Sequence, residues 1–127
     1  MLEDTPQLDW ANAKVTPEGV IGVHWMTPAP PEEYVRVFAQ IVERHQQEVR
    51  GQQWDSIRVL GDGLAVHGAE PEAAERLKQH LAECADHARV ELHRREKQEN
   101  AAQAQSEREA QERAAKAAEL QRRLRGN

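Results

Sequence analysis

The sequence predicts a small α+β domain of order β-α-β-β-α, a three-stranded sheet with two helices. The last helix is expected to continue as a long, charged, coiled-coil-like C-terminal helix. Three observations support this prediction: three short β-rich runs, two longer segments with apolar residues at helical spacing, and a change of composition near His93. Strand side chains repeat every two residues and helical ones every 3.6, so the two kinds of segment can be distinguished.

Apolar residues are concentrated in the first 92 positions. This part contains all three Trp, the only Tyr and Phe, and every Val and Ile, whereas Leu120 and Leu124 are the only large apolar side chains in 93–127. A core must bury enough apolar surface to offset the entropy lost on folding. We therefore expect a compact α+β domain over 1–92, including an irregular arm over 1–12 anchored by Trp10. An extended, partly frayed helical tail is expected over 93–127.

The first strand is predicted over 19–26. Thr16-Pro17-Glu18-Gly19 has proline and glycine at the second and fourth positions, as β-turns favour, and the β-rich run from Val20 to Trp25 follows. Residues 14–16 form an alternative hairpin arm that would pair with this strand. Prolines at 28, 30 and 31 end the strand, because proline cannot donate to the ladder.

The first helix is predicted over 31–50. Pro31 suits the first helical position, Glu32 and Glu33 suit the positive end of the helix dipole, and Gly51 ends the helix. One apolar face recurs at intervals of mostly three and four residues: Tyr34, Val35, Phe38, Ile41, Val42, His45 and Val49.

A β-hairpin is predicted next, with strands at 56–60 and 64–67 and Trp54 just before them. Gly61-Asp62-Gly63 forms its turn and is able to supply positive φ angles; a following strand and the lack of a Lys-Ser/Thr pair exclude a phosphate loop. A right-handed crossover would make the first strand parallel to the second, with both helices on one face. This order matches most of a split β-α-β motif, a fold that does not determine function.

The last helix is predicted from Pro71 to residue 124, because no glycine or proline follows Pro71 until Gly126. Unbroken, it would span about 80 Å, more than a body of 92 residues can cover. Pairs such as Glu91/Arg95 and Glu119/Arg123 have the favourable i,i+4 spacing; Glu109/Arg113 and Glu112/Lys116 share it.

This long helix is the best candidate for a partner surface, since an exposed helix gains little from its own packing. A heptad-like seam precedes residue 93, a weaker polar stretch follows, and a narrow stripe of small residues returns near the end. The helix is expected either to oligomerise or to dock on another protein; the alternative is a solvated single helix held by ion pairs. The expected contact positions are Leu77, Leu81, Ala88, Leu92, Ala110, Ala114, Ala117, Leu120 and Leu124.

Charge argues against nucleic acid as the favoured partner. Residues 1–92 hold 8 Lys+Arg and 16 Asp+Glu, a balance of −8, and residues 93–127 hold 9 and 6, a balance of +3, which together give −5. Phosphate binding needs clustered cations. Arg122, Arg123 and Arg125 keep a nucleic-acid-associated accessory factor as the alternative function, although cations also favour a helix C-terminus without any ligand.

A second alternative is a metal-binding protein. His80, Cys84 and His87 stand at i, i+4 and i+7 on the last helix and are transition-metal ligand types. Against this, one helix rarely supplies three ligands to one ion, and Cys84 also fits as a small buried residue of the seam. We therefore expect no cofactor.

The expected function is that of a non-enzymatic interaction or assembly accessory protein of phage or mobile-element origin, in which the body over 1–92 is the recognition domain. No nucleophile motif accompanies the histidines, and serine occurs only at 56 and 106. A single cysteine, an acidic N-terminus without an apolar run, and no segment of about 20 apolar residues predict a cytoplasmic protein without a membrane span. Arginine outnumbers lysine by 13 to 4, which is typical of a high-GC bacterium or one of its phages.

Overall fold

The computed structural model describes residues 4–46 and 54–126. The chain divides into two units, Met1–His93 and Arg94–Asn127. The α+β class predicted from the sequence is confirmed. The elements follow in the order η1 (Trp10–Asn12), β1 (Lys14–Val15), β2 (Val20–His24), α1 (Glu32–Gln46), β3 (Ser56–Leu60), β4 (Gly63–His67), η2 (Pro71–Ala73) and α2 (Ala74–Arg125).

The sheet has four strands in the order β1-β2-β4-β3, one more than the three predicted. Each neighbouring pair is antiparallel, with Val23 opposite Leu64 and Ile57 opposite Val66. Strands β2 and β3 therefore run parallel to each other with β4 between them, as the split β-α-β order requires.

The fourth strand, β1, is the hairpin arm considered as an alternative. Thr16 closes the turn: its amide donates to the Val20 carbonyl at 2.9 Å, and its hydroxyl accepts from the Val20 amide at 3.1 Å. Gly19 has φ +86°, which L side chains rarely adopt. The turn thus returns Lys14 and Val15 alongside Gly22 and Ile21.

The N-terminal arm, which was expected to be irregular, forms no strand but is hydrogen-bonded to the chain at and just after the end of β2. Leu8 forms an isolated bridge with Trp25. The Asp9 amide donates to the His24 carbonyl and the Met26 amide to the Gln7 carbonyl, both at 2.8 Å. Trp10 packs, partly buried, against the core, as its predicted role of anchor requires.

The β3–β4 hairpin forms where predicted, but the expected positive φ angles do not occur in its turn. Among described residues, the positive φ values belong to Gly19 and Gly68. Gly63 is needed for a different reason: a Cβ there would meet the Val23 carbonyl and lie 2.7 Å from the His24 Cα. Close approach of β2 to β4 therefore excludes a side chain at this position.

Helix α1 begins one residue after the predicted start and is described to Gln46, so the predicted end at residue 50 lies outside the described residues. Its buried side chains include Val37, which the predicted apolar face omitted, whereas Val35 is only partly buried. The side-chain Nε2 of Gln46 donates to the Ile57 carbonyl at 2.9 Å, which joins the end of the helix to the edge strand β3.

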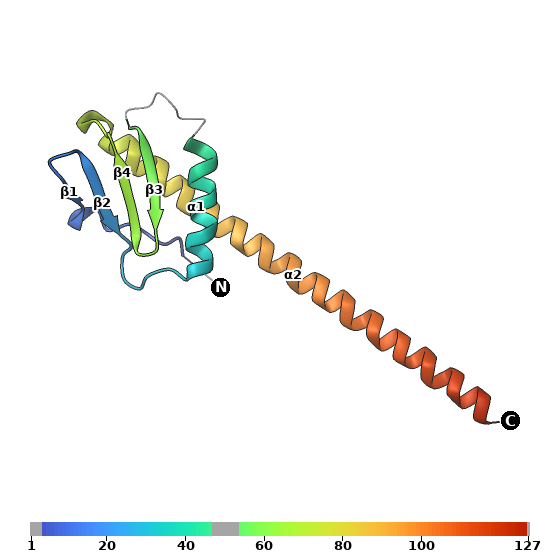
Figure 1. The fold of residues 1–127 in the computed structure, drawn as a ribbon. Helices are drawn as coiled ribbons and strands as arrows, with labels where there is room; N and C mark the ends of the chain where they lie inside the picture. The colour runs from blue at the N-terminus through green and yellow to red at the C-terminus, as the bar shows by residue number, and fades with distance from the viewer. Residues whose placement is uncertain (1–3, 47–53, 127) are drawn as a thin grey trace. The chain divides into compact units, whose positions relative to one another are not determined.

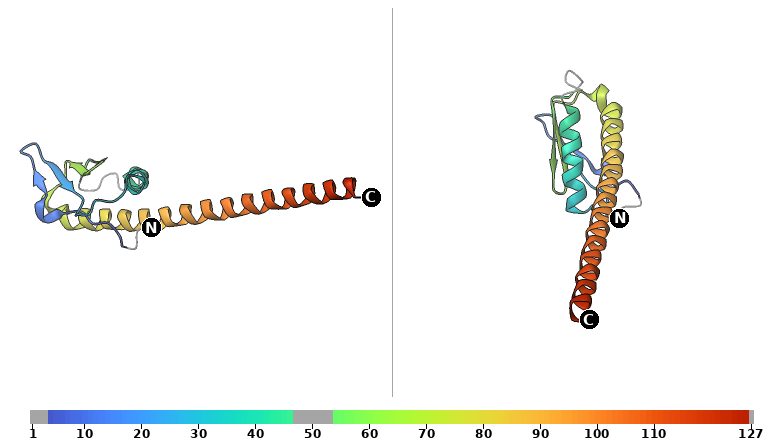
Figure 2. Two further views of the ribbon diagram at one scale, coloured as in Figure 1. Left: turned by 90° about the horizontal axis from the view of Figure 1, so that it is seen from below. Right: turned by 90° about the vertical axis from the view of Figure 1, so that its right-hand side faces the viewer.

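Helix α1 and residues 74–93 of α2 cover the same face of the sheet (Figures 1 and 2). The opposite face carries exposed polar side chains, among them His24, Arg58 and His67. The alternation of buried and exposed residues along each strand follows from this one-sided burial. The core is one cluster, with Tyr34, Phe38, Leu81 and Val66 fully buried.

Helix α2 confirms the predicted long C-terminal helix, running for 52 residues after a 3₁₀ turn at Pro71–Ala73. Its last buried residue among those described is Leu92, and every residue from 97 to 126 is exposed. No described helix is both long and apolar enough to cross a membrane.

Candidate functional site

The most exposed apolar surface of the second unit lies on the last turns of α2. Leu120 and Leu124 are 60% and 78% exposed, and Ala110, Ala114 and Ala117 are exposed on the preceding turns. We call these five residues the tail stripe. Their spacing places them along one side of the helix, since residues three and four apart are neighbours on its surface.

Polar side chains elsewhere on the tail bind one another within the helix. Arg123 contacts Glu119 at 2.8 Å, which is one of the predicted i,i+4 pairs, and the Gln105 amide donates to Glu109 at 3.1 Å. Arg108 donates to the Gln105 side-chain oxygen at 3.0 Å. These contacts support the helix by a few tenths of a kcal/mol each. They leave the tail stripe as an apolar strip beside charged groups.

The tail stripe is shorter than the predicted partner surface. Leu77, Leu81, Ala88 and Leu92 lie in the core of the first unit, each 5% exposed or less. Their heptad-like spacing is also the spacing of a helix face packed on a sheet, and the sheet buries them. A partner of the folded chain can reach only the predicted positions from Ala110 onward.

The arginines at the end of α2 are exposed, as a nucleic-acid contact would require. Arg123 contacts Glu119, whereas Arg122 and Arg125 line a shallow hollow together with Ala118, Gln121 and Gly126. All three lie in the last turn, where cations favour the helix dipole. The nucleic-acid alternative stays a prediction.

The predicted metal ligands gather near the first helix but do not form a metal site. His80 Nε2 lies 3.8 Å from Cys84 Sγ, and the His87 ring lies 6.0 Å from that of His45 on α1. Within residues 4–46 and 54–126, no group of three or more His, Cys, Asp or Glu side chains is arranged to hold an ion. His45 also lies in this cluster of histidine and cysteine side chains. It was not among the predicted ligands, although its place on the apolar face of the first helix was a signal.

Burial sets the protonation of this cluster. It raises the pKa of the Cys84 thiol to about 11, with Glu83 adding to the effect, so the thiol is protonated at neutral pH. Burial, with His45 second, lowers the pKa of His80. The Trp54 ring lies 5.6 Å from the His80 ring, which places this imidazole against apolar surface.

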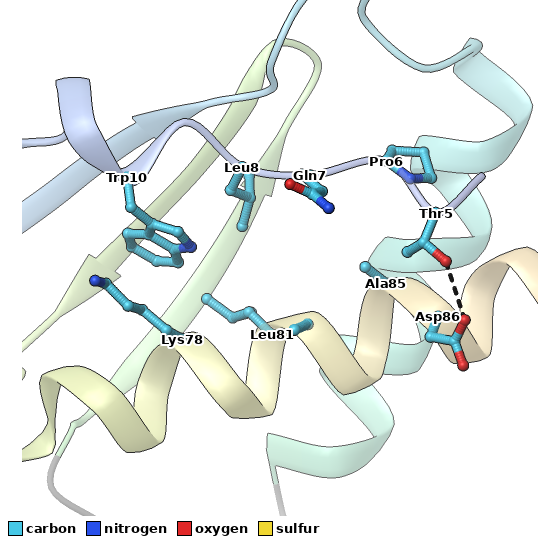
Figure 3. A pocket seen from close by; sticks show the side chains of 10 residues that line it. Thr5, Pro6, Gln7, Leu8, Trp10, Lys78, Leu81, Ala85 and Asp86 are labelled. Carbon is cyan, nitrogen blue, oxygen red and sulfur yellow. Dashed lines mark hydrogen bonds between the residues drawn. The ribbon is translucent and has the colours of Figure 1, made fainter.

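A cavity of about 400 Å³ lies between the N-terminal arm and α2 (Figure 3). We call it the strap cavity, because residues 5–10 pass over the helix like a strap. Leu81 and Ala85 form its floor, and Trp10 and Lys78 lie at one end (Figure 3). The lining residues are Thr5, Pro6, Gln7, Leu8, Trp10, Lys78, Leu81, Ala82, Ala85 and Asp86.

The other end of the strap is held by a polar latch. Thr5 donates its hydroxyl hydrogen to Asp86 at 3.0 Å and accepts from Arg89 Nε at 3.0 Å, while Arg89 also contacts Asp86 at 3.2 Å. Hydrogen bonds from Thr5 and Arg89 lower the pKa of Asp86. Sequence reasoning missed this latch, because nothing in the pattern links positions more than 80 residues apart.

Comparisons with protein-family models, with curated proteins and with solved structures found no match to this chain.

Proposed function

We propose that this chain is a non-enzymatic interaction or assembly protein, in which the first unit recognises a target and the C-terminal helix oligomerises or docks on another protein. We place it in the cytoplasm of a bacterium or of a phage-infected host. The observation that supports the proposal is the exposure of Leu120 and Leu124, 60% and 78%, on a helix whose residues from 97 to 126 are all exposed.

The leucines of the tail stripe contribute free energy by burial only when a partner covers them. Burying one leucine fully contributes about 1.5–3 kcal/mol, so Leu120 and Leu124 together offer several kcal/mol to an interface. Helices in folded proteins are stabilised mainly by the packing of an apolar face against the rest of the structure, and the exposed tail lacks such packing. A partner would therefore stabilise the helix as well as bind it.

Small side chains favour a second helix as the partner surface. Ala110, Ala114 and Ala117 precede the leucines, and their size allows two backbones to approach closely. The partner helix can come from a second copy of the chain or from a different protein. Both choices use the same five positions, so variants of the tail stripe test both.

The test is light scattering behind size-exclusion chromatography on the full chain. Ala117→Glu places a charge on the tail stripe, and Ala115→Glu places the same charge about 160° away on the same helix, which makes a matched control. We expect the wild type and Ala115→Glu to form a dimer or larger species, and Ala117→Glu or the pair Leu120→Gln and Leu124→Gln to be monomeric.

A monomeric wild type would reject self-association and leave docking on a different protein, for which the tail serves as bait in a pull-down with the same two glutamate variants. Equal capture by Ala115→Glu and Ala117→Glu would reject the tail stripe altogether. Salt-sensitive retention on DNA that disappears when Arg122, Arg123 and Arg125 become Ala would instead support the nucleic-acid alternative.

A further inference from the structure

The strap cavity has no role in the proposed function, and the strap that covers it is hydrogen-bonded at both ends. At one end, Thr5 is latched to Asp86 and Arg89 on α2. At the other end, the backbone of Gln7 and Asp9 is bonded to Met26 and His24. With both ends of the strap bonded, a ligand entering the space between them would have little backbone to reorganise, which favours binding.

The cavity is hollow because small residues lie beneath the strap. On the α2 side the cavity is lined by Ala85, which is buried, and Ala82, which is exposed, and neither side chain is long enough to fill the space. Leu8 and Leu81 add apolar walls. The volume, about 400 Å³, lies within the range of small-molecule pockets, roughly 300–1,000 Å³.

The cavity has one charged side chain at each end, Asp86 at the latch and Lys78 beside Trp10, and only the charge of Asp86 is well compensated by its neighbours. Asp86 accepts from both Thr5 and Arg89, so its carboxylate is compensated by a neighbouring cation. Lys78 Nζ lies 3.7 Å from Glu75 Oε1 in a solvent-exposed pair, a kind of contact that contributes little. The positive end of the cavity is therefore the one available to a ligand.

Trp10 lies beside Lys78 at that same end (Figure 3). The indole offers a flat apolar surface on which an aromatic ring can stack, and the ammonium offers a partner for an anion. We propose that the strap cavity binds a flat, apolar small molecule with one anionic group, its body between the strap and Leu81 and its anion at Lys78.

Two dyes test the site on the full chain. 8-Anilinonaphthalene-1-sulfonate carries a flat apolar body and an anion, and N-phenyl-1-naphthylamine is its neutral counterpart. We expect saturable, one-to-one binding of the sulfonate to the native protein. In a proton–nitrogen NMR titration, the indole signal of Trp10 should shift, while those of the core residues Trp25 and Trp54 should not.

Two substitutions locate the site and its charge. Ala82→Leu adds bulk to the cavity lining and should weaken the binding of both dyes at least about tenfold. Ala74→Leu, the same change at an equally exposed position of α2 that does not line the cavity, should leave their binding unchanged. Lys78→Gln should weaken the sulfonate about tenfold and leave the neutral dye within about twofold. Urea unfolding of each variant confirms that the fold is retained.

Four results would overturn the proposal. Absence of saturable binding, or binding that survives Ala82→Leu in a folded variant, rejects the strap cavity as the site. A shift of Trp25 or Trp54 in place of Trp10 puts the dye in another part of the core. If Lys78→Gln weakens the binding of the two dyes to the same extent, the preference for an anionic ligand is rejected.

Discussion

The hydroxyl of Tyr34 donates a hydrogen bond to the carbonyl oxygen of Ala85 at 2.7 Å, joining α1 to α2 inside the core. Tyr34 is fully buried, and its burial raises the pKa of the hydroxyl far above the ordinary value of 10.0, so this donor keeps its hydrogen across the accessible pH range. The bond thus adds a buried polar contact between the two helices that cover the sheet.

Tyr34→Phe removes this bond and keeps the ring. We expect the free energy of unfolding to fall by about 1–2 kcal/mol, the usual effect of losing one buried hydrogen bond. Urea denaturation followed by tryptophan fluorescence measures the change, with an unaltered m-value showing that the native fold persists. An unchanged midpoint would mean that the bond does not contribute to stability.

Gly63→Ala should disrupt the sheet where β2 and β4 meet. The new Cβ would lie 2.7 Å from the His24 Cα, so the strands must separate, and we expect a loss of about 1–3 kcal/mol. Gly61→Ala is the matched control, because a Cβ there meets nothing within 4 Å. The midpoint of thermal unfolding should fall for Gly63→Ala and stay unchanged for Gly61→Ala. Equal midpoints in the two variants would contradict the close approach of β2 to β4.

Cys84 should react slowly in the native protein. Its side chain is 3% exposed and its pKa is about 11, against an ordinary 9.0, so at pH 8 the thiolate is about a hundredfold rarer than in a free thiol. Timed reaction with a disulfide reagent should therefore be at least about a hundredfold slower than for free cysteine, and urea should restore the normal rate. Complete reaction of the folded chain during mixing would refute the burial.

Acid should weaken the fold through His80. Its pKa is lowered in the folded state, chiefly by burial, so the unfolded chain binds more protons just below the ordinary value of 6.5. Stability therefore falls as pH drops from 6.5 toward the folded pKa, and His80→Gln should flatten this slope. Urea unfolding at several pH values measures it, with exposed His67→Gln as the control for removing one histidine. An identical slope in His80→Gln would exclude this origin.

The repeating patterns in the sequence predicted much of the fold. The helix over Glu32–Gln46, the β3–β4 hairpin and the long α2 were all expected, because periodicity, prolines and glycines act over a few neighbouring residues. The three-strand prediction missed β1, since a two-residue strand gives too short a pattern to count as one. The tail stripe lies on the exposed end of α2, and its role as a partner surface is still a prediction.

Tertiary structure decided which apolar residues at helical spacing are buried in the core and which stay exposed. Leu77 and Leu120 both belong to helical apolar series, yet the sheet buries Leu77 while Leu120 stays exposed. The latch of Thr5 with Asp86 and Arg89, and the cavity above Ala85, arise from contacts between segments far apart in the chain. The sequence by itself determined the local elements, since backbone propensity and side-chain periodicity act locally. Their burial and the sites between them depend on long-range packing, which no local pattern records.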